Sequence, residues 1–203
     1  MTTRNLQSDM EVDLVAVGSG IGASCTAIAA HAQGLDTVIL EKSDKFGGGT
    51  TYSYGIVWVG DNHLERALGI QDSKEEAYEY LHHLAAGHEI EANLRAYIEW
   101  SPEALRFFCD EVGIPFYVVS GFPDYFQHMS PGSLGEGRNL QVRPFEAKSL
   151  GEWRENLRAA PAVRRAGKAA ELGPAVDPGA HGSGYSNVWR RPHRTPDDGG
   201  PAP

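Results

Sequence analysis

A short apolar run that ends in a glycine-rich turn constrains this chain more than any other feature. The run is residues 12–17, Val-Asp-Leu-Val-Ala-Val, and the turn is Gly18-Ser19-Gly20-Ile21-Gly22-Ala23, which fits the pattern G-x-G-x-x-A. Such a run is typical of a parallel strand covered on both faces. The first two pattern glycines allow a sharp turn and close approach to a pyrophosphate, and a small third residue lets the next helix pack on the strand.

The residues after the turn complete a strand-helix-strand unit. The helix directs backbone N–H groups and the positive end of its dipole at the turn. We expect Gly34 to end the helix, residues 37–40 to form the second strand, and Glu41 to follow its tip. At this spacing an acidic side chain accepts a hydrogen bond from a ribose 2′-OH, which favours FAD or NAD over NADP. The glycine pattern alone is weak evidence, but the whole unit predicts dinucleotide binding.

The next segment is rich in glycine and hydroxyl groups. It contains Gly47-Gly48-Gly49-Thr50-Thr51 and then Ser53-Tyr54-Gly55, so we expect no regular structure before Ile56. On composition alone it could be a flexible connector. Its position directly after Glu41 instead favours a loop that wraps a polar ligand.

These residues resemble the FAD-binding family that includes fumarate reductase flavoproteins and 3-ketosteroid Δ1-dehydrogenases. The family signature is E-K-x-x-x-x-G-G-x-T-x-x-S-x-G, and it is matched here by Glu41, Lys42, Gly47, Gly48, Thr50, Ser53 and Gly55. Tyr54 departs from the usual glycine of close relatives. The loop lacks the histidine that binds FAD covalently in some relatives, so the resemblance implies non-covalent FAD. The predicted FAD-binding residues are Gly18, Ser19, Gly20, Gly22, Ala23, Glu41, Lys42, Gly48, Gly49, Thr50, Thr51, Ser53 and Gly55.

Residues 61–113 read as helices. Ser73 begins a capping box for a helix that Gly87 closes, a second helix contains Leu94 and Ile98, and a third begins with Ser101 as N-cap and Pro102 in its first turn. We expect no metal site at His82, His83 and His88, because no carboxylate has a suitable sequence spacing. Residues 114–119 read as an edge strand, because Pro115 lacks an N–H group. Ser149 suggests a further capping box and short helix.

Residues 121–140 interleave turn residues with aromatic side chains, which either anchor a loop or face a ligand. Here the chain again resembles the family, most closely its ketosteroid dehydrogenase branch. The resemblance implies that Tyr125 stands beside the substrate ring and assists proton removal, so Tyr125 is the catalytic candidate. Arg138 is a weaker candidate with a structural role as the alternative.

The resemblance implies an FAD-dependent dehydrogenase. In this chemistry a base removes a proton next to a ketone, hydride passes to flavin N5, and a C=C bond forms. The implied substrate is steroid-like or another enone precursor, with a fumarate reductase-like reaction as an alternative. Two further alternatives are a non-catalytic remnant or split subunit that binds nucleotide weakly and an NAD-binding module unrelated to flavin.

Charge and cysteine content narrow the possible partners. The chain has 203 residues and a net charge of −9, which disfavours nucleic acid and anionic membrane surfaces as partners. The first ten residues lack an apolar signal core, so we expect a cytoplasmic protein without a membrane span. Cys25 and Cys109 are predicted to be buried free thiols.

The predicted fold class is α/β, comprising the N-terminal βαβ part of a Rossmann-like FAD-binding domain (residues 1–60) and a helical, substrate-side segment (residues 61–158). Residues 159–203 are rich in Ala, Gly and Pro and read as a disordered tail. Because family sequence ends near Leu157, we expect a truncated or frame-disrupted member that a complementing chain could complete. A two-stranded parallel sheet should be marginal alone.

Overall fold

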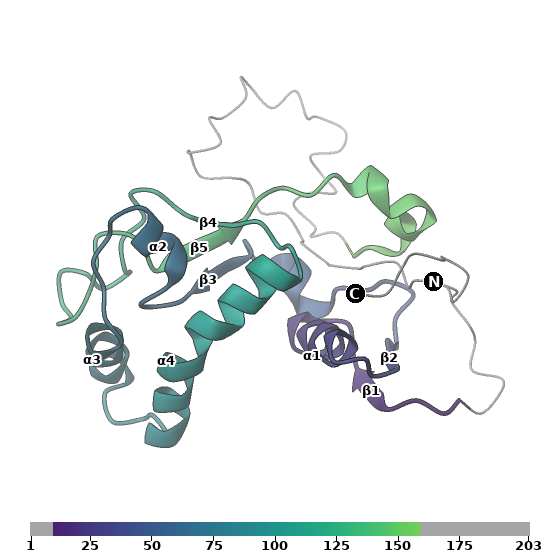
Figure 1. Cartoon of the computed structure of the whole chain (residues 1–203), viewed down its shortest axis with the longest axis horizontal. Coiled ribbons are helices and arrows are strands. Elements are labelled where there is room, and N and C mark those ends of the chain that lie inside the picture. Colours follow the sequence, from purple (N-terminus) through teal and green to yellow (C-terminus); the bar gives the residue numbers. More distant parts are fainter. Residues whose placement is uncertain (1–9, 159–203) are drawn as a thin grey trace. The chain divides into compact units, whose positions relative to one another are not determined.

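A computed structural model describes residues 10–158, which form two compact units (Figure 1). The first unit contains residues 10–48 and Glu152–Arg158, and the second contains Gly49–Gly151. The predicted functional boundary at residue 60 remains a prediction, and the predicted disordered tail lies outside the described residues.

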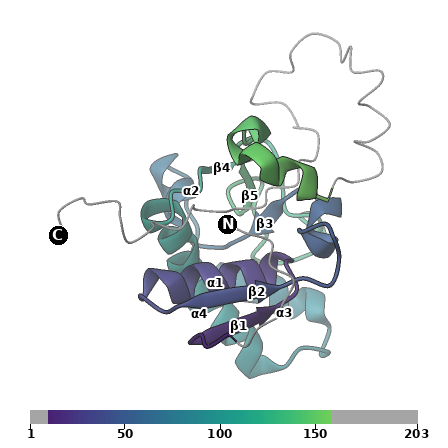
Figure 2. The same cartoon turned by 90° about the vertical axis from the view of Figure 1, so that its right-hand side faces the viewer.

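The first unit is a strand-helix-strand unit. Strand β1 (Leu14–Val17) leads through the glycine turn to helix α1 (Ile21–Ala32), and strand β2 (Thr37–Leu40) then pairs in parallel with β1. The register joins Leu14 to Thr37 and Val17 to Leu40. Figure 2 shows α1 running alongside the two strands. The predicted βαβ unit is therefore confirmed.

The expectation that β1 is covered on both faces is wrong for the described residues. Ala16 is 6% exposed, whereas Val15 is 52% and Val17 is 81% exposed. Successive side chains of a strand point to opposite faces, so Ala16 lies on the covered face and the two valines on the other. In the part of this unit that the structure describes, α1 is the helix that packs on these strands.

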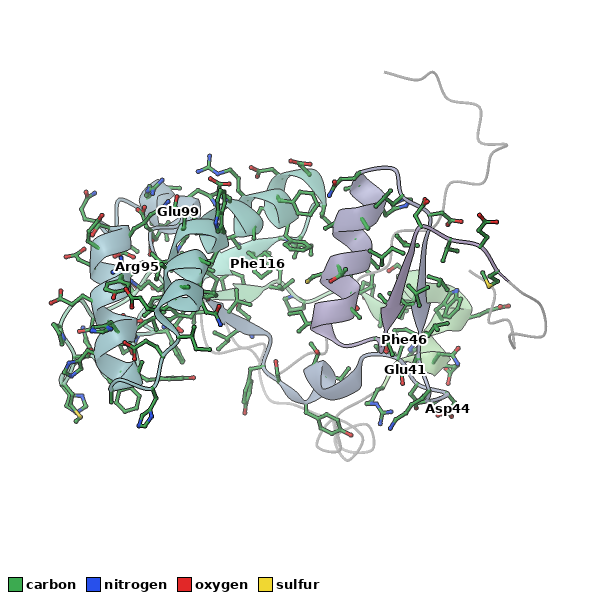
Figure 3. All side chains as sticks on the ribbon, turned by 90° about the horizontal axis from the view of Figure 1, so that it is seen from below. Glu41, Asp44, Phe46, Arg95, Glu99 and Phe116 are labelled. Atoms are coloured by element: carbon green, nitrogen blue, oxygen red, sulfur yellow. The ribbon has the colours of Figure 1, made fainter. Side chains whose placement is uncertain are left out.

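The segment Glu152–Arg158 returns to the loop that follows β2 (Figure 3). Phe46, which is 4% exposed, pairs with Leu157 in an isolated parallel bridge. The backbone N–H of Phe46 donates to the Asn156 carbonyl at 2.8 Å, and its ring centroid lies 6.3 Å from that of Trp153. These contacts join residues more than a hundred positions apart in the sequence.

The helix predicted to start at Ser149 takes a different form. The chain forms a 3₁₀ helix, η3 (Ala147–Asn156), which is interrupted at Gly151, where φ is 55°. Ser149 lies inside η3 and not before its first residue, and its hydroxyl donates to the Glu146 carbonyl at 2.7 Å. The prediction failed because a serine hydroxyl also bonds to preceding backbone carbonyls.

The second unit contains a three-stranded antiparallel sheet. Its strands are β3 (Ile56–Trp58), β4 (Phe116–Val118) and β5 (Asn139–Val142), in the order β3-β5-β4. Strand β4 therefore lies at an edge of this sheet, as predicted from Pro115. The buried side chains of Val59, Leu105, Val118 and Leu140 form the hydrophobic core.

Three helices precede β4. They are α2 (His63–Ala67), α3 (Lys74–Ala85) and α4 (Glu91–Arg106), and a π-helical turn, η2 (Phe107–Glu111), follows α4. The predicted start of α3 is confirmed, because the Ser73 hydroxyl accepts from the Glu76 N–H at 3.1 Å.

The predicted break before Pro102 is wrong, because α4 runs through this proline. Ile98 and Leu105 lie seven residues apart, on the same face of the helix, and are 7% and 5% exposed. Continuous burial of this face offsets the one backbone hydrogen bond that the proline removes. The sequence pattern Ser-Pro is equally compatible with a helix start and a helix interior, and packing decides between them.

Candidate functional site

The glycine turn and the second strand meet through Ser19 and Glu41. The backbone N–H and the hydroxyl of Ser19 both donate to Oε2 of Glu41, at 3.0 and 2.6 Å. Ser19 is 5% exposed. Because Ser19 stands between the first two glycines of the pattern, Glu41 lies at the mouth of the turn. Figure 3 labels Glu41 just beyond the end of β2.

The backbone geometry at positions 18 and 48 favours glycine over residues with a side chain. Gly18 has a φ of 87°, in the region that favours glycine, and its N–H donates to the Leu40 carbonyl at 2.7 Å. Gly48 lies against the turn, so a Cβ atom on it would stand 3.3 Å from the Cα atom of Gly20. The N–H of the preceding Gly47 donates to the Ser19 hydroxyl at 2.8 Å. The glycine-rich segment after β2 therefore begins directly on the glycine turn.

The environment of Glu41 favours its ionised form. The Ser19 hydroxyl is the strongest of several donors that lower its pKa, followed by the backbone N–H of Ser43, which donates to Oε1 at 3.0 Å. A carboxylate has about four lone-pair positions. After these contacts, Glu41 therefore retains capacity to accept from a further hydroxyl group, such as that of a ribose.

The N-terminus of α1 has the features of an anion-binding helix end. Its N-cap is Gly20, which offers no side-chain cap, and no acidic residue lies in the first turn. The positive end of the helix dipole is therefore not neutralised by a nearby carboxylate. Together with the Glu41 carboxylate and the closely packed glycines, this end has the features that the predicted dinucleotide site requires.

The remaining predicted residues are distributed over both units. Gly22 and Lys42 are exposed and Ala23 is half-buried in the first unit. The second unit contains Gly49, Thr50, Thr51, Ser53, Gly55 and Tyr125. The structure therefore brings together Gly18, Ser19, Gly20, Glu41 and Gly48.

The hydroxyl-rich segment forms a short 3₁₀ helix, η1 (Gly48–Tyr52), where we expected irregular structure. Thr51 is 2% exposed in this helix. The Ser53 hydroxyl accepts from the Gly55 N–H at 2.9 Å, and Gly55 has a φ of 71°. The positive φ at position 55 therefore favours glycine in this turn.

Tyr125 and Arg138 have opposite environments. Tyr125 is 74% exposed, and its ring contacts that of Phe122 edge to face at 5.7 Å. Arg138 is 1% exposed and forms ion pairs with Asp72 and Asp124. The structure thus favours the structural alternative for Arg138.

The structure also describes the histidines that were considered as metal ligands and the two cysteines. Nδ1 of His82 pairs with Glu89 at 2.6 Å, and their ligand atoms lie within 4.8 Å of those of Glu91. The expectation that no carboxylate lies at a ligand spacing from these histidines is therefore wrong for His82, because the turn between α3 and α4 places Glu89 beside it. Cys25 and Cys109 are free and half-buried, and burial raises the pKa of both thiols.

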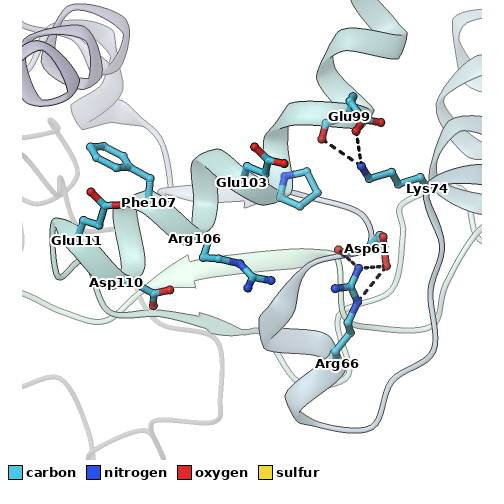
Figure 4. A pocket seen from close by; sticks show the side chains of 10 residues that line it. Asp61, Arg66, Lys74, Glu99, Glu103, Arg106, Phe107, Asp110 and Glu111 are labelled. Carbon is cyan, nitrogen blue, oxygen red and sulfur yellow. Dashed lines mark hydrogen bonds and ion pairs between the residues drawn. The ribbon is translucent and has the colours of Figure 1, made fainter. Parts of the chain in front are cut away.

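A charged hollow between α2, α3 and α4 contains none of the predicted site residues among those that line it (Figure 4). Arg66 pairs with Asp61 at 2.5 Å and Lys74 with Glu99 at 2.8 Å, so acids of the same hollow compensate these cations. No helix within residues 10–158 is long and apolar enough to cross a bilayer.

Sequence reasoning missed a buried acid in the second unit. Asn62 caps α2 and accepts from the N–H groups of Leu64 and Glu65, while Oε1 of Glu65 accepts from the Asn62 N–H at 2.6 Å. Glu65 is 0% exposed. The spacing Asn-x-x-Glu is that of a capping box, so this signal was available in the sequence.

The pKa of Glu65 is strongly raised. Desolvation by burial is the main cause and raises the pKa to about 8, and the nearby Asp72 carboxylate contributes. Oε2 of Glu65 has no hydrogen-bond partner within the described structure. Burial therefore favours the protonated, neutral form of Glu65.

Comparison with known proteins identifies one family. A family model described as "FAD binding domain" matches residues 13–199. The 3-oxosteroid 1-dehydrogenase of Mycolicibacterium smegmatis is 35% identical over 141 residues, which are 70% of this chain and 25% of the relative. The 4-oxocyclohexanecarboxylate 2-dehydrogenase of Sinomonas cyclohexanicum is 36% identical over 148 residues, 72% of this chain and 26% of the relative.

A solved structure supports the same relationship. The 3-ketosteroid Δ1-dehydrogenase of Sterolibacterium denitrificans, in complex with 1,4-androstadiene-3,17-dione, matches with a TM-score of 0.66 and 36% identity. The match covers 73% of this chain and 26% of that chain. The chain thus spans about a quarter of the length of these relatives.

Proposed function

This chain belongs to the family of FAD-binding domains, with FAD as its cofactor, and on that premise we propose that it is part of an FAD-dependent dehydrogenase acting on a ring ketone. The proposed reaction introduces a C=C bond next to the ketone of a steroid-like substrate. FAD is bound without a covalent link.

The observation that carries the proposal is the junction of Ser19, Glu41 and Gly48. Ser19 holds the ionised Glu41 at the mouth of the glycine turn, where its carboxylate is placed to accept from a ribose hydroxyl. Gly48 lies close enough to Gly20 that any side chain at position 48 would crowd the turn. These residues hold the adenosine and pyrophosphate part of FAD in the proposal.

The remaining predicted residues have proposed roles at the flavin and the substrate. Thr50, Thr51 and Ser53 offer hydroxyl groups along the flavin edge. When bound, FAD would supply the acceptor for a hydride, which carries both electrons of the oxidation. In the proposal, the Tyr125 hydroxyl stands beside the substrate ring and assists the group that removes the proton next to the ketone.

The names of the relatives support the substrate class. Both "3-oxosteroid 1-dehydrogenase" and "4-oxocyclohexanecarboxylate 2-dehydrogenase" denote dehydrogenation of a compound that bears an oxo group. A ring ketone is the chemistry that these names share. An exposed aromatic ring such as that of Tyr125 offers an apolar surface for such a ring.

A fumarate reductase-like activity is the second candidate. The NADH:fumarate oxidoreductase of Klebsiella pneumoniae is 35% identical over 100 residues, but the match covers 48% of this chain and 11% of the relative. The larger shares covered by the ketone dehydrogenases favour the first candidate. Fumarate is the discriminating ligand in the experiment below.

The test begins with the visible spectrum of the purified full chain and a fluorescence titration with FAD. We expect flavin bands near one equivalent or saturable binding of added FAD. A 3-ketosteroid should then perturb the flavin spectrum, whereas fumarate should not, and Tyr125→Phe should reduce any turnover with an artificial electron acceptor by roughly 10²-fold or more. A colourless chain that binds no FAD would support a non-catalytic remnant and contradict the proposal.

A further inference from the structure

The loop that carries Tyr125, residues 121–137, joins β4 to β5. Some of its side chains are buried and others are exposed. Tyr125 is 74% and Met129 is 65% exposed, whereas the neighbouring Asp124 is 2% and Ser130 is 7% exposed. An exposed aromatic side chain therefore directly follows a buried carboxylate. The contacts of that carboxylate determine where the backbone of Tyr125 lies.

Both carboxylate oxygens of Asp124 and its backbone N–H form hydrogen bonds. Its Oδ1 accepts from Nε1 of Trp58 at 2.6 Å, and its Oδ2 accepts from the Leu134 N–H at 2.9 Å. The Asp124 N–H donates to the Leu134 carbonyl at 3.0 Å. Asp124 thus closes the loop on itself through Leu134 and ties it to the sheet through Trp58 on β3.

Arg138 links the Asp124 carboxylate to that of Asp72, which precedes α3. Its Nη1 donates to Oδ2 of Asp124 at 3.0 Å and to the Gly132 carbonyl at 2.7 Å. Its Nε and Nη2 donate to the two oxygens of Asp72 at 2.7 and 2.5 Å. A guanidinium group offers five N–H donors in a rigid planar arrangement, so it can hold two carboxylates and a carbonyl at fixed directions.

The buried cluster carries more formal negative charge than positive charge. Asp72 and Asp124 together carry two negative charges against the one positive charge of Arg138, and all three side chains are at most 1% exposed. Burial and the nearby Asp72 carboxylate raise the pKa of Glu65, which disfavours a third negative charge beside this cluster. A buried pair of this kind is far more costly to break than to keep, which makes the anchor stiff.

Helix α3 holds the far end of the loop. Gly132 has a φ of 66°, and a Cβ atom there would collide with the Glu76 carbonyl oxygen of α3. The Tyr80 hydroxyl accepts from the Phe126 N–H at 3.4 Å. The Tyr125 backbone thus lies between an anchor at Asp124 and a second one at Phe126.

We propose that Asp124 and Arg138 are positioning residues for Tyr125: their buried ion pair determines where the loop presents this phenol. The proposal rests on the proposed function in one respect, namely the role of Tyr125 beside the substrate. Asp124 and Arg138 need not touch substrate or FAD, and they act through the backbone that joins them to Tyr125.

The test follows the NMR signals of the Tyr125 ring in the full chain with labelled tyrosine, assigned with Tyr125→Phe. In the parent protein, the edge-to-face contact with Phe122 should shift these signals away from those of a free tyrosine. In Asp124→Asn, the new amide group faces the indole N–H of Trp58, so two donors oppose each other. We expect the Tyr125 signals to move to the free position while other resonances stay dispersed.

Rescue separates positioning from general destabilisation. Trp58→Phe combined with Asp124→Asn removes the opposing donor, so the Tyr125 signals should return part of the way. Asp61→Asn is the matched control, because Asp61 also pairs with an arginine but lies outside the loop. Unchanged Tyr125 signals in a folded Asp124→Asn protein would overturn the proposal.

A second variant decides the question if Asp124→Asn does not fold. Trp58→Phe alone introduces no new polar group, but it removes the donor to Oδ1 of Asp124, which is buried. It should therefore shift the Tyr125 signals partially, and unchanged signals would again overturn the proposal. These signals are measured without FAD or steroid. The activity of Tyr125→Phe tests the proposed function separately. If the Tyr125 signals respond as expected but Tyr125→Phe dehydrogenates a steroid as fast as the parent protein, the positioning of Tyr125 is supported and its proposed role beside the substrate is contradicted.

Discussion

Ser19 donates two hydrogen bonds to one oxygen of Glu41, from its backbone N–H at 3.0 Å and from its hydroxyl at 2.6 Å, across 22 positions of sequence. This relationship joins the glycine turn to the tip of the second strand. It also places a negative charge at the position where we propose that the FAD ribose binds. Two predictions about FAD binding follow from this junction.

Replacing Glu41 with glutamine should weaken FAD binding without unfolding the chain. The amide has nearly the same shape, but it loses the charge that strengthens hydrogen bonds, worth about 1.5–3 kcal/mol for a charged acceptor. We therefore expect a Kd for FAD raised about tenfold to a hundredfold, measured by flavin fluorescence. Glu11→Gln, at an exposed position of the same unit, is the control. Equal affinity in both variants would argue against ribose recognition by Glu41.

Gly48→Ala should impair FAD binding more than it impairs folding. A methyl group would stand 3.3 Å from Gly20, and the residue has a φ of 53°. Gly34→Ala is a matched control, because Gly34 has a φ of 83° and open space around it. Both variants should lose about 1–2 kcal/mol of unfolding free energy from backbone strain. If calorimetry shows this loss and Gly34→Ala also abolishes FAD binding, close packing at Gly48 is not the cause.

The stability of the second unit should fall as the pH rises. The folded-state pKa of Glu65 is raised from its ordinary value near 4.5 to about 8, so the folded state binds a proton that the unfolded state has already released. Between these values the unfolding free energy decreases with pH. We expect a loss on the order of 3 kcal/mol between pH 5 and 8.

Urea unfolding at several pH values measures this loss, and Glu65→Gln should remove most of it. Glu99→Gln is the control, because Glu99 is half-exposed and paired with Lys74 at the surface. A pH dependence that persists in Glu65→Gln would assign the effect to another group.

Ser101→Ala distinguishes a continuous α4 from two separate helices. An N-cap serine would cost about 1 kcal/mol when replaced by alanine. Here the Ser101 hydroxyl is buried without a hydrogen-bond partner among the described residues, so its removal should be neutral or stabilising by a few tenths of a kcal/mol, about the size of most substitutions without a named contact. Urea unfolding monitored by circular dichroism measures the difference. A loss near the N-cap value would mean that the helix breaks before Pro102.

The sequence alone was sufficient for the βαβ unit. Its strands, the helix between them and the acid after the second strand are separated by short distances, and each follows from local rules of turn, helix and strand formation. The predicted strands at residues 37–40 and 114–119 appear in the structure as β2 and, in shorter form, β4. Local conformational preference and apolar patterning are enough for such elements.

The tertiary structure decided everything that depends on contacts between distant residues. It placed Arg138 between Asp72 and Asp124, brought Glu152–Arg158 back to Phe46, and continued α4 through Pro102. The free energy of burying a charge or an apolar face depends on partners that sequence spacing does not reveal. The sequence by itself therefore determined the cofactor-binding motif, and only the fold determined which charged side chains are buried and how Tyr125 is anchored.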